Sequence, residues 1–115
     1  MMTAIPNRIK IGWKQYDVVF ADSRLNSGAE LYGQINYDNC TITLRESSSP
    51  DQLRATLIHE VLHAIAEMYG LPLEEKLVTD LANALYTAIK DNYWDESKAY
   101  KITKEDKLKA EVEKI

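Results

Sequence analysis

The sequence predicts an α+β domain, in which a small, mostly antiparallel three-stranded sheet is followed by an antiparallel pair of helices. Residues 9–45 contain short segments in which apolar and polar residues alternate, as in half-buried strands. Residues 49–92 instead place apolar residues at helical spacing. Residues 96–115 hold six lysines and five acidic residues, a composition that buries little apolar surface. We therefore expect one domain over residues 1–95 and a charged C-terminal helix or tail beyond it.

Three segments of the first zone are candidate strands. Residues 16–20 (YDVVF) are rich in β-branched and aromatic side chains. Residues 31–37 and 41–45 alternate in polarity. Asp38 and Asn39 lie between them and suit a two-residue hairpin turn, because both residue types tolerate left-handed backbone. The last two segments are therefore predicted to pair as an antiparallel hairpin.

Two helices are predicted in the second zone. Ser49 suits the N-cap of the first helix, Pro50 suits its first position, and Gln52 completes a capping box with Ser49. Gly70 is typical of a residue that ends a helix. A second helix is expected from near Leu73, and so short a connection makes the two helices antiparallel neighbours.

Charge and composition exclude several classes of function. The net charge of the 115-residue chain is -4, whereas a protein whose main partner is nucleic acid clusters Lys and Arg. No apolar run approaches the roughly 20 residues that span a bilayer, and the N-terminus lacks the apolar segment of a signal peptide. Cys40 is the single cysteine, so no internal disulfide can form. We expect a soluble cytoplasmic protein without nucleic-acid or membrane partners.

The segment HEVLH (59–63) has the H-E-x-x-H spacing of a zinc site. On a helix, His59 and His63 lie one turn apart on one face, so both imidazoles can bind one tetrahedral zinc ion. Glu60 is rotated by roughly 100° and can reach a water on the metal, whose pKa zinc lowers to about 7. Glu60 would take a proton as general base and return it to a leaving amine. Two ordinary surface histidines are the alternative, but these are the only histidines of the chain and both fall in the pattern.

A catalytic zinc site needs a third protein ligand, and the second helix offers Glu74, Glu75 and Asp80. A helical wheel places Glu75 on the same edge of the helix pair as the histidines, Asp80 on the opposite edge and Glu74 in the seam. We choose Glu75 and keep the other two as alternatives; both glutamates could also only complement a helix dipole. Tyr86 shares the histidine edge, so it is either a donor to the oxyanion or a half-buried tyrosine.

Three segments resemble the small phage and prophage proteins of the ImmA/IrrE-like zinc metallopeptidases. They are LIHEVLHAI (57–65), LANALYTAIKDN (81–92) and GQINYDNCTITL (33–44). The resemblance covers roughly residues 9–92. It implies a short sheet before the motif helix and a second helix after it.

The resemblance also implies a minimal gluzincin-like site that holds one zinc ion. His59 and His63 would be ligands, and Glu60 would be the general base. Glu75 takes the position of the family's third ligand at the start of the second helix. The best-understood family members act on repressor-like regulators. The implied partner is therefore a protein or peptide substrate in the cytoplasm of a bacterial host.

Three functions are compatible with these observations, and we expect the first. It is a zinc endopeptidase, which could bind a peptide by strand addition along residues 31–37 or 41–45. The second is a catalytically inactive phage or prophage accessory protein that keeps the metal-binding fold. The third is a helix-turn-helix DNA binder. It is disfavoured because the second helix carries only Lys76 and Lys90 as cations.

Overall fold

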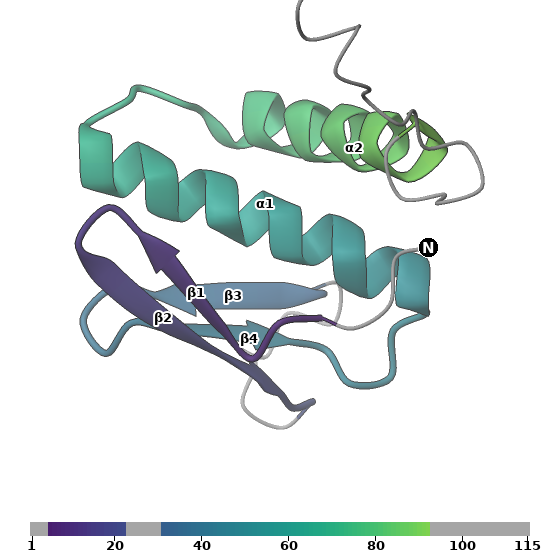
Figure 1. Ribbon diagram of the computed structural model, residues 1–115, viewed down its shortest axis with the longest axis horizontal. Coiled ribbons are helices and arrows are strands. Elements are labelled where there is room, and N and C mark those ends of the chain that lie inside the picture. Colours follow the sequence, from purple (N-terminus) through teal and green to yellow (C-terminus); the bar gives the residue numbers. More distant parts are fainter. Residues whose placement is uncertain (1–4, 23–30, 93–115) are drawn as a thin grey trace, which may run out of the picture.

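The computed structural model describes residues 5–22 and 31–92, and the α+β class is as predicted (Figure 1). Its elements are β1 (Arg8–Ile11), β2 (Lys14–Phe20), β3 (Gly33–Asn36), β4 (Thr41–Leu44), α1 (Pro50–Tyr69) and α2 (Glu75–Asn92). Within these residues, no helix combines the length and apolar character needed to cross a membrane. The predicted boundary at residue 95 and the charged segment 96–115 lie outside the described residues.

The sheet has four strands where the sequence predicted three, and it is mixed. Its order is β1-β2-β4-β3, with β1 antiparallel to β2, β2 parallel to β4, and β4 antiparallel to β3. The strand missed by prediction, β1, forms a hairpin with β2 through Gly12, whose φ of 61° suits glycine. The parallel pair arises because the β3–β4 hairpin places β4, and not β3, beside β2. No local pattern in the sequence specifies that choice.

The β3–β4 hairpin is as predicted, but its turn is longer. Residues 37–40 connect the strands, instead of Asp38 and Asn39 alone. The Asn36 side chain closes the turn, because its Oδ1 accepts from the backbone N–H of Asp38 at 2.9 Å and of Asn39 at 3.1 Å. Cys40 adopts the left-handed conformation, with φ of 52°. The side chain of Asn36, which precedes the turn, therefore helps to close it.

The ends of α1 largely follow the predicted signals. Ser49 Oγ accepts a hydrogen bond from the backbone N–H of Gln52 at 3.2 Å, and Pro50 is the first helical residue. The Gln52 side chain donates to Thr56 Oγ1 at 2.9 Å instead of reaching back to Ser49, so only half of the predicted capping box forms. Gly70 ends the helix with φ of 65°.

Helix α1 is the middle layer of the molecule (Figure 1). One side packs on the sheet, against β1, β3 and β4, and another contacts α2. The core between α1 and the sheet consists of buried side chains, namely Ile11, Tyr16, Val18, Ile42, Leu44, Leu57 and Ala64. On α2 the buried side chains are Val78, Ala82 and Tyr86. A pocket opens where β3, α1 and α2 meet.

Candidate metal centre

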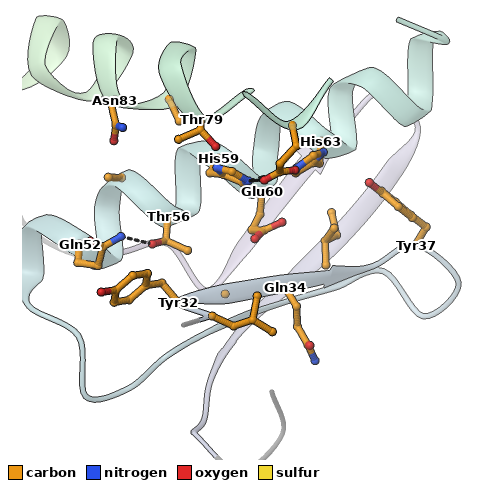
Figure 2. Close-up of a pocket in the computed structure, with 16 residues that line it drawn as sticks. Tyr32, Gln34, Tyr37, Gln52, Thr56, His59, Glu60, His63, Thr79 and Asn83 are labelled. Carbon is orange, nitrogen blue, oxygen red and sulfur yellow. Dashed lines mark hydrogen bonds and ion pairs between the residues drawn. The ribbon is translucent and has the colours of Figure 1, made fainter. Parts of the chain in front are cut away.

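Helix α1 places its two histidines on one face, one turn apart. His59 Nε2 and His63 Nε2 lie 3.2 Å from each other, and the ring centroids are 4.9 Å apart. Both side chains are half-buried between α1 and α2 (Figure 2). The i,i+4 spacing of the motif therefore brings both imidazoles to one point, as helix geometry requires.

Glu75 contacts both histidines from the first turn of α2. Its Oε1 is 2.7 Å from His59 Nε2, and its Oε2 is 2.8 Å from His63 Nε2. Helix α2 begins at Glu75 itself, later than the predicted start near Leu73. The turn that follows Gly70 brings this end of α2 back beside α1 (Figure 1). The structure thus brings together the three residues that the sequence predicted as metal ligands.

The two alternative ligands lie outside this group. Asp80 accepts a hydrogen bond from Lys76 Nζ at 2.7 Å on the exposed surface of α2. Glu74 precedes the helix, and its carbonyl oxygen accepts from the backbone N–H of Val78 at 3.0 Å. In the part of the chain that the structure describes, the two histidines and Glu75 form the one group of three side chains close enough to share an ion.

The donor set fits a zinc ion. Two histidines and one glutamate, with an open fourth position, are a known ligand set of catalytic zinc. Bonds of about 2.0–2.1 Å at tetrahedral angles hold ligand atoms about 3.3 Å apart. The two histidine nitrogens are already at 3.2 Å. The Glu75 oxygens are closer, at hydrogen-bonding distance, and this side chain is 67% exposed, so a small rotation would make room for the ion.

Burial also favours the neutral form of His59. It lowers the pKa of His59 below its usual 6.5; the charge of Glu75 opposes this change, and the proximity of His63 adds to it. A neutral imidazole is the form that binds a metal. The net effect therefore keeps a nitrogen lone pair available near neutral pH.

Glu60 is the buried member of the site, with 6% of its surface exposed. Its side chain points from α1 toward β3, on the sheet side of the histidines (Figure 2). Burial raises the pKa of Glu60 from 4.5 to about 7, and the negative charge of Glu75 adds to the rise. The carboxyl group can therefore take up or release a proton near neutral pH.

Gly33 is a site residue that the sequence analysis missed. A Cβ atom there would lie 2.5 Å from Thr56 Cγ2 and 3.0 Å from the carbonyl oxygen of Thr43, so glycine is what lets α1 pack this close to β3. The same Cβ would lie 3.5 Å from Glu60 Oε2. An isolated glycine in an alternating strand signals a close backbone approach, and that signal could have identified Gly33.

The site opens into a pocket of about 640 Å³. Besides Gly33, the two histidines, Glu60 and Glu75, it is lined by Leu31, Tyr32, Gln34, Ile35, Tyr37, Gln52, Ala55, Thr56, Thr79, Ala82 and Asn83. Most of these side chains are neutral, and no lysine or arginine is among the lining residues that the structure describes. Tyr32 and Tyr37 lie at opposite ends of β3 (Figure 2).

Tyr86 does not line this pocket. Its side chain is buried, and its hydroxyl donates a hydrogen bond to Asp51 in the first turn of α1. That bond lowers the pKa of Asp51, and Lys90, 3.5 Å from the same carboxylate, acts in the same direction. The wheel therefore placed Tyr86 on a suitable edge of α2, but its position does not support the predicted contact with an oxyanion at the histidines.

Comparisons with known proteins identify no relative. No protein-family model matches the chain, and no curated protein or solved structure matches it.

Proposed function

We propose that this protein is a zinc-dependent metallopeptidase that hydrolyses a peptide bond within a protein substrate. One observation supports the proposal above others: two imidazole nitrogens and a carboxylate converge beside a second, buried carboxylate. His59, His63 and Glu75 would hold one zinc ion and leave its fourth position open. Bound there, zinc would polarise the scissile carbonyl group and lower the pKa of a water molecule to about 7.

Glu60 would act as general base and then as general acid. Hydrolysis needs a group that removes a proton from the attacking water and later gives a proton to the departing amine. In the metal-free protein, burial raises the pKa of Glu60 to about 7, so this carboxyl group can both accept and give up a proton near neutral pH. The positive charge of bound zinc would lower this pKa and favour the carboxylate form that accepts the first proton.

An extended peptide would bind along β3. This strand is an edge of the sheet, since β4 pairs with one of its sides and no strand of the described residues pairs with the other. Across the ladder, the carbonyl oxygen of Tyr32 accepts from the backbone N–H of Arg45 at 2.8 Å. Because antiparallel ladders alternate, the backbone N–H and C=O groups of Gly33 and Ile35 face the open side. A peptide added there would pass beside Glu60.

The strand order selects one of the two segments, 31–37 and 41–45, along which the sequence allowed a peptide to bind. Strand β4 lies between β2 and β3, so both of its sides are already paired. Strand β3 lines the pocket and has an open side. The peptide is therefore assigned to β3, within the segment 31–37.

The pocket lining favours cleavage within a chain over removal of a C-terminal residue. A carboxypeptidase needs a cation to bind the free carboxylate of its substrate. The described lining holds no lysine or arginine that could bind such a carboxylate. Thr79 and Asn83 instead offer neutral partners for a peptide backbone.

The resemblance to ImmA/IrrE-like metallopeptidases extends the proposal to a substrate class. The best-understood of those enzymes act on repressor-like regulators. If this protein is encoded by a phage or prophage, we propose that its substrate is such a regulator in the cytoplasm of the bacterial host. The supporting residues are the motif HEVLH (59–63) and Glu75 at the start of α2. An inactive accessory protein with the same fold is the alternative, and it differs in having no turnover.

A comparison of zinc-loaded wild type with zinc-loaded Glu60→Gln distinguishes a peptidase from an inactive accessory protein. Both are expected to bind about one zinc ion per chain, because Glu60 is not a ligand. Wild type is expected to cleave internal bonds in a mixture of synthetic peptides, followed by mass spectrometry. Glu60→Gln should lose about 10²- to 10⁴-fold of this activity. Zinc binding without cleavage of peptides or repressor-like proteins would favour the inactive protein, and absence of zinc binding would exclude both functions.

A further inference from the structure

Two tyrosine hydroxyls near the helices differ in what they contact. The Tyr86 hydroxyl donates to Asp51, away from the pocket. Tyr37 lines the pocket of the candidate metal centre, and its hydroxyl has no hydrogen-bond partner among residues 5–22 and 31–92. The hydroxyl oxygen of Tyr37 is also not among the fully buried polar atoms that lack a hydrogen-bond partner. A donor of this kind is available to a molecule bound in the pocket.

The hairpin holds the Tyr37 ring in a defined position. Tyr37 follows β3 directly, and its ring packs against the hydrophobic core. Its carbonyl oxygen accepts from Cys40 Sγ at 3.7 Å, and Asn36 Oδ1 accepts from the next two backbone N–H groups. The ring is directed from the hairpin toward the turn of α1 that carries His63 (Figure 2). A donor fixed in advance needs little reorganisation during a reaction.

The Tyr37 hydroxyl also interacts with the charges of the site. Burial raises the pKa of Tyr37 above its usual 10, and the negative charges of Glu60 and Glu75 contribute to the rise. The hydroxyl is therefore protonated at neutral pH and can donate a hydrogen bond there. A negative charge that forms next to it on a substrate would be stabilised by that donor.

Two other polar side chains of the pocket, Gln52 and Tyr32, are less suited to this task. The Gln52 amide already donates to Thr56 Oγ1 at 2.9 Å. Tyr32 lies at the end of β3 that is remote from His63 (Figure 2). The described lining holds no lysine or arginine. Tyr37 is therefore the tyrosine whose position and unengaged hydroxyl fit a site next to the histidines.

We infer that the Tyr37 hydroxyl donates a hydrogen bond to the carbonyl oxygen of the scissile peptide bond as negative charge develops on it; this inference rests on the proposed peptidase function. When the water oxygen bonds to the carbonyl carbon, Glu60 takes a water proton and the π-electron pair moves to the oxygen that Tyr37 contacts. When that pair returns, the C–N bond breaks and Glu60 gives its proton to the departing amine. Tyr37 keeps its own proton throughout and is a catalytic residue through charge stabilisation.

Two peptide analogues separate this role from packing and from metal binding. A phosphonamidate dipeptide analogue presents a tetrahedral, anionic oxygen, whereas a mercaptoacyl dipeptide analogue binds zinc through sulfur and presents no such oxygen. In zinc-loaded Tyr37→Phe, affinity for the phosphonamidate should fall about 10- to 100-fold, the effect of one hydrogen bond to a charged oxygen. Affinity for the mercaptoacyl analogue should change by less than about twofold. Titration calorimetry measures both.

Tyr86→Phe is the matched control, because it removes a hydroxyl of the same kind outside the pocket. It should bind both analogues as wild type does. Unchanged phosphonamidate binding by Tyr37→Phe would overturn the inference, and so would an equal loss of both analogues, which indicates a structural role. Failure of zinc-loaded wild type to bind the phosphonamidate would overturn it as well. Each of these three outcomes contradicts the inference about Tyr37 while wild type still binds zinc. If wild type does not bind zinc, the proposed peptidase function is contradicted as well.

Discussion

The two sides of the seam between α1 and α2 differ in the side chains that line them. One side is the pocket that contains two histidines and two carboxylates. The other is an apolar groove of about 340 Å³, lined by Pro6, Arg54, Leu57, Ile58, Val61, Leu62, Ile65, Leu85 and Ile89. Within the motif HEVLH (59–63), the two histidines and Glu60 line the pocket, whereas Val61 and Leu62 line the groove.

This difference shows that neighbouring residues of one helical turn contribute to different properties. Substitutions on the pocket side are expected to change metal binding and proton transfer. Substitutions on the groove side are expected to change the free energy of unfolding, because apolar contacts dominate there. His63 and Leu62, which are adjacent in sequence and lie on opposite sides, provide a matched pair.

The largest expected effect is on zinc content, which should fall on substitution of the pocket-side residue His63 but not of the groove-side residue Leu62. His63→Ala removes one of three proposed ligands, so the dialysed variant should retain no zinc, whereas wild type should retain about one ion per chain. Leu62→Ala should retain as much as wild type. Inductively coupled plasma mass spectrometry of the three dialysed proteins measures the zinc content. Equal zinc in wild type and His63→Ala would contradict the proposed site.

The next largest effect concerns the buried carboxyl group of Glu60, on the pocket side, in metal-free protein. The pKa of Glu60 is raised from 4.5 to about 7 on folding, so the folded state binds this proton more tightly than the unfolded state. The resulting stabilisation is complete below pH 4.5 and is lost as the pH rises through 7. The corresponding free energy is about 3 kcal/mol. Glu60→Gln should therefore match wild type near pH 4 and exceed its stability by up to about 3 kcal/mol near pH 8.

Urea denaturation in the presence of a chelator, at a series of pH values, measures this difference. The titration of His59 is shared by both proteins, so subtracting their free energies of unfolding isolates Glu60. Parallel pH profiles for wild type and Glu60→Gln would show that folding does not perturb this carboxyl group. The expected result is a variant that gains stability while it loses the proposed general base.

A smaller effect is expected where the pocket meets the sheet. Gly33→Ala places a methyl group 2.5 Å from Thr56 Cγ2, which overpacks the contact between β3 and α1. The expected loss is about 2 kcal/mol of unfolding free energy, measured by chemical denaturation. Thr56→Ala removes that Cγ2 atom, so the double variant should recover part of the loss. Strictly additive losses in this double-mutant cycle would contradict the steric explanation.

The smallest effect lies on the groove side. Leu62 is half-buried, so Leu62→Ala should lower the unfolding free energy by about 1 kcal/mol, less than the loss of a fully buried leucine. Its zinc affinity should equal that of wild type, because its side chain lies on the other side of the seam. Thermal unfolding of the metal-free variant and zinc titration give the two quantities. Weaker zinc binding would show that the groove and the pocket are coupled.

The sequence predicted the parts of the site that depend on angles around a helix. His59 and His63 share a face because they are one turn apart, and the wheel placed Glu75 on the matching edge of α2. The same wheel selected Tyr86, which is about 16 Å along the helix axis from Glu75. A helical wheel gives the angle of each residue around the helix axis, but not its position along that axis. Tyr86 therefore meets Asp51, near the opposite end of the helix pair.

The sequence alone determined the local features of this protein: the N-cap of α1 at Ser49, its C-cap at Gly70 and the histidine pair, because each depends on contacts within a few residues. Only the tertiary structure decided that β4 lies between β2 and β3, that Gly33 opens space beside the Glu60 carboxylate, and that Tyr37 lines the pocket. These features depend on how distant segments pack. Strand order and the offset between two helices leave no periodic pattern along the chain.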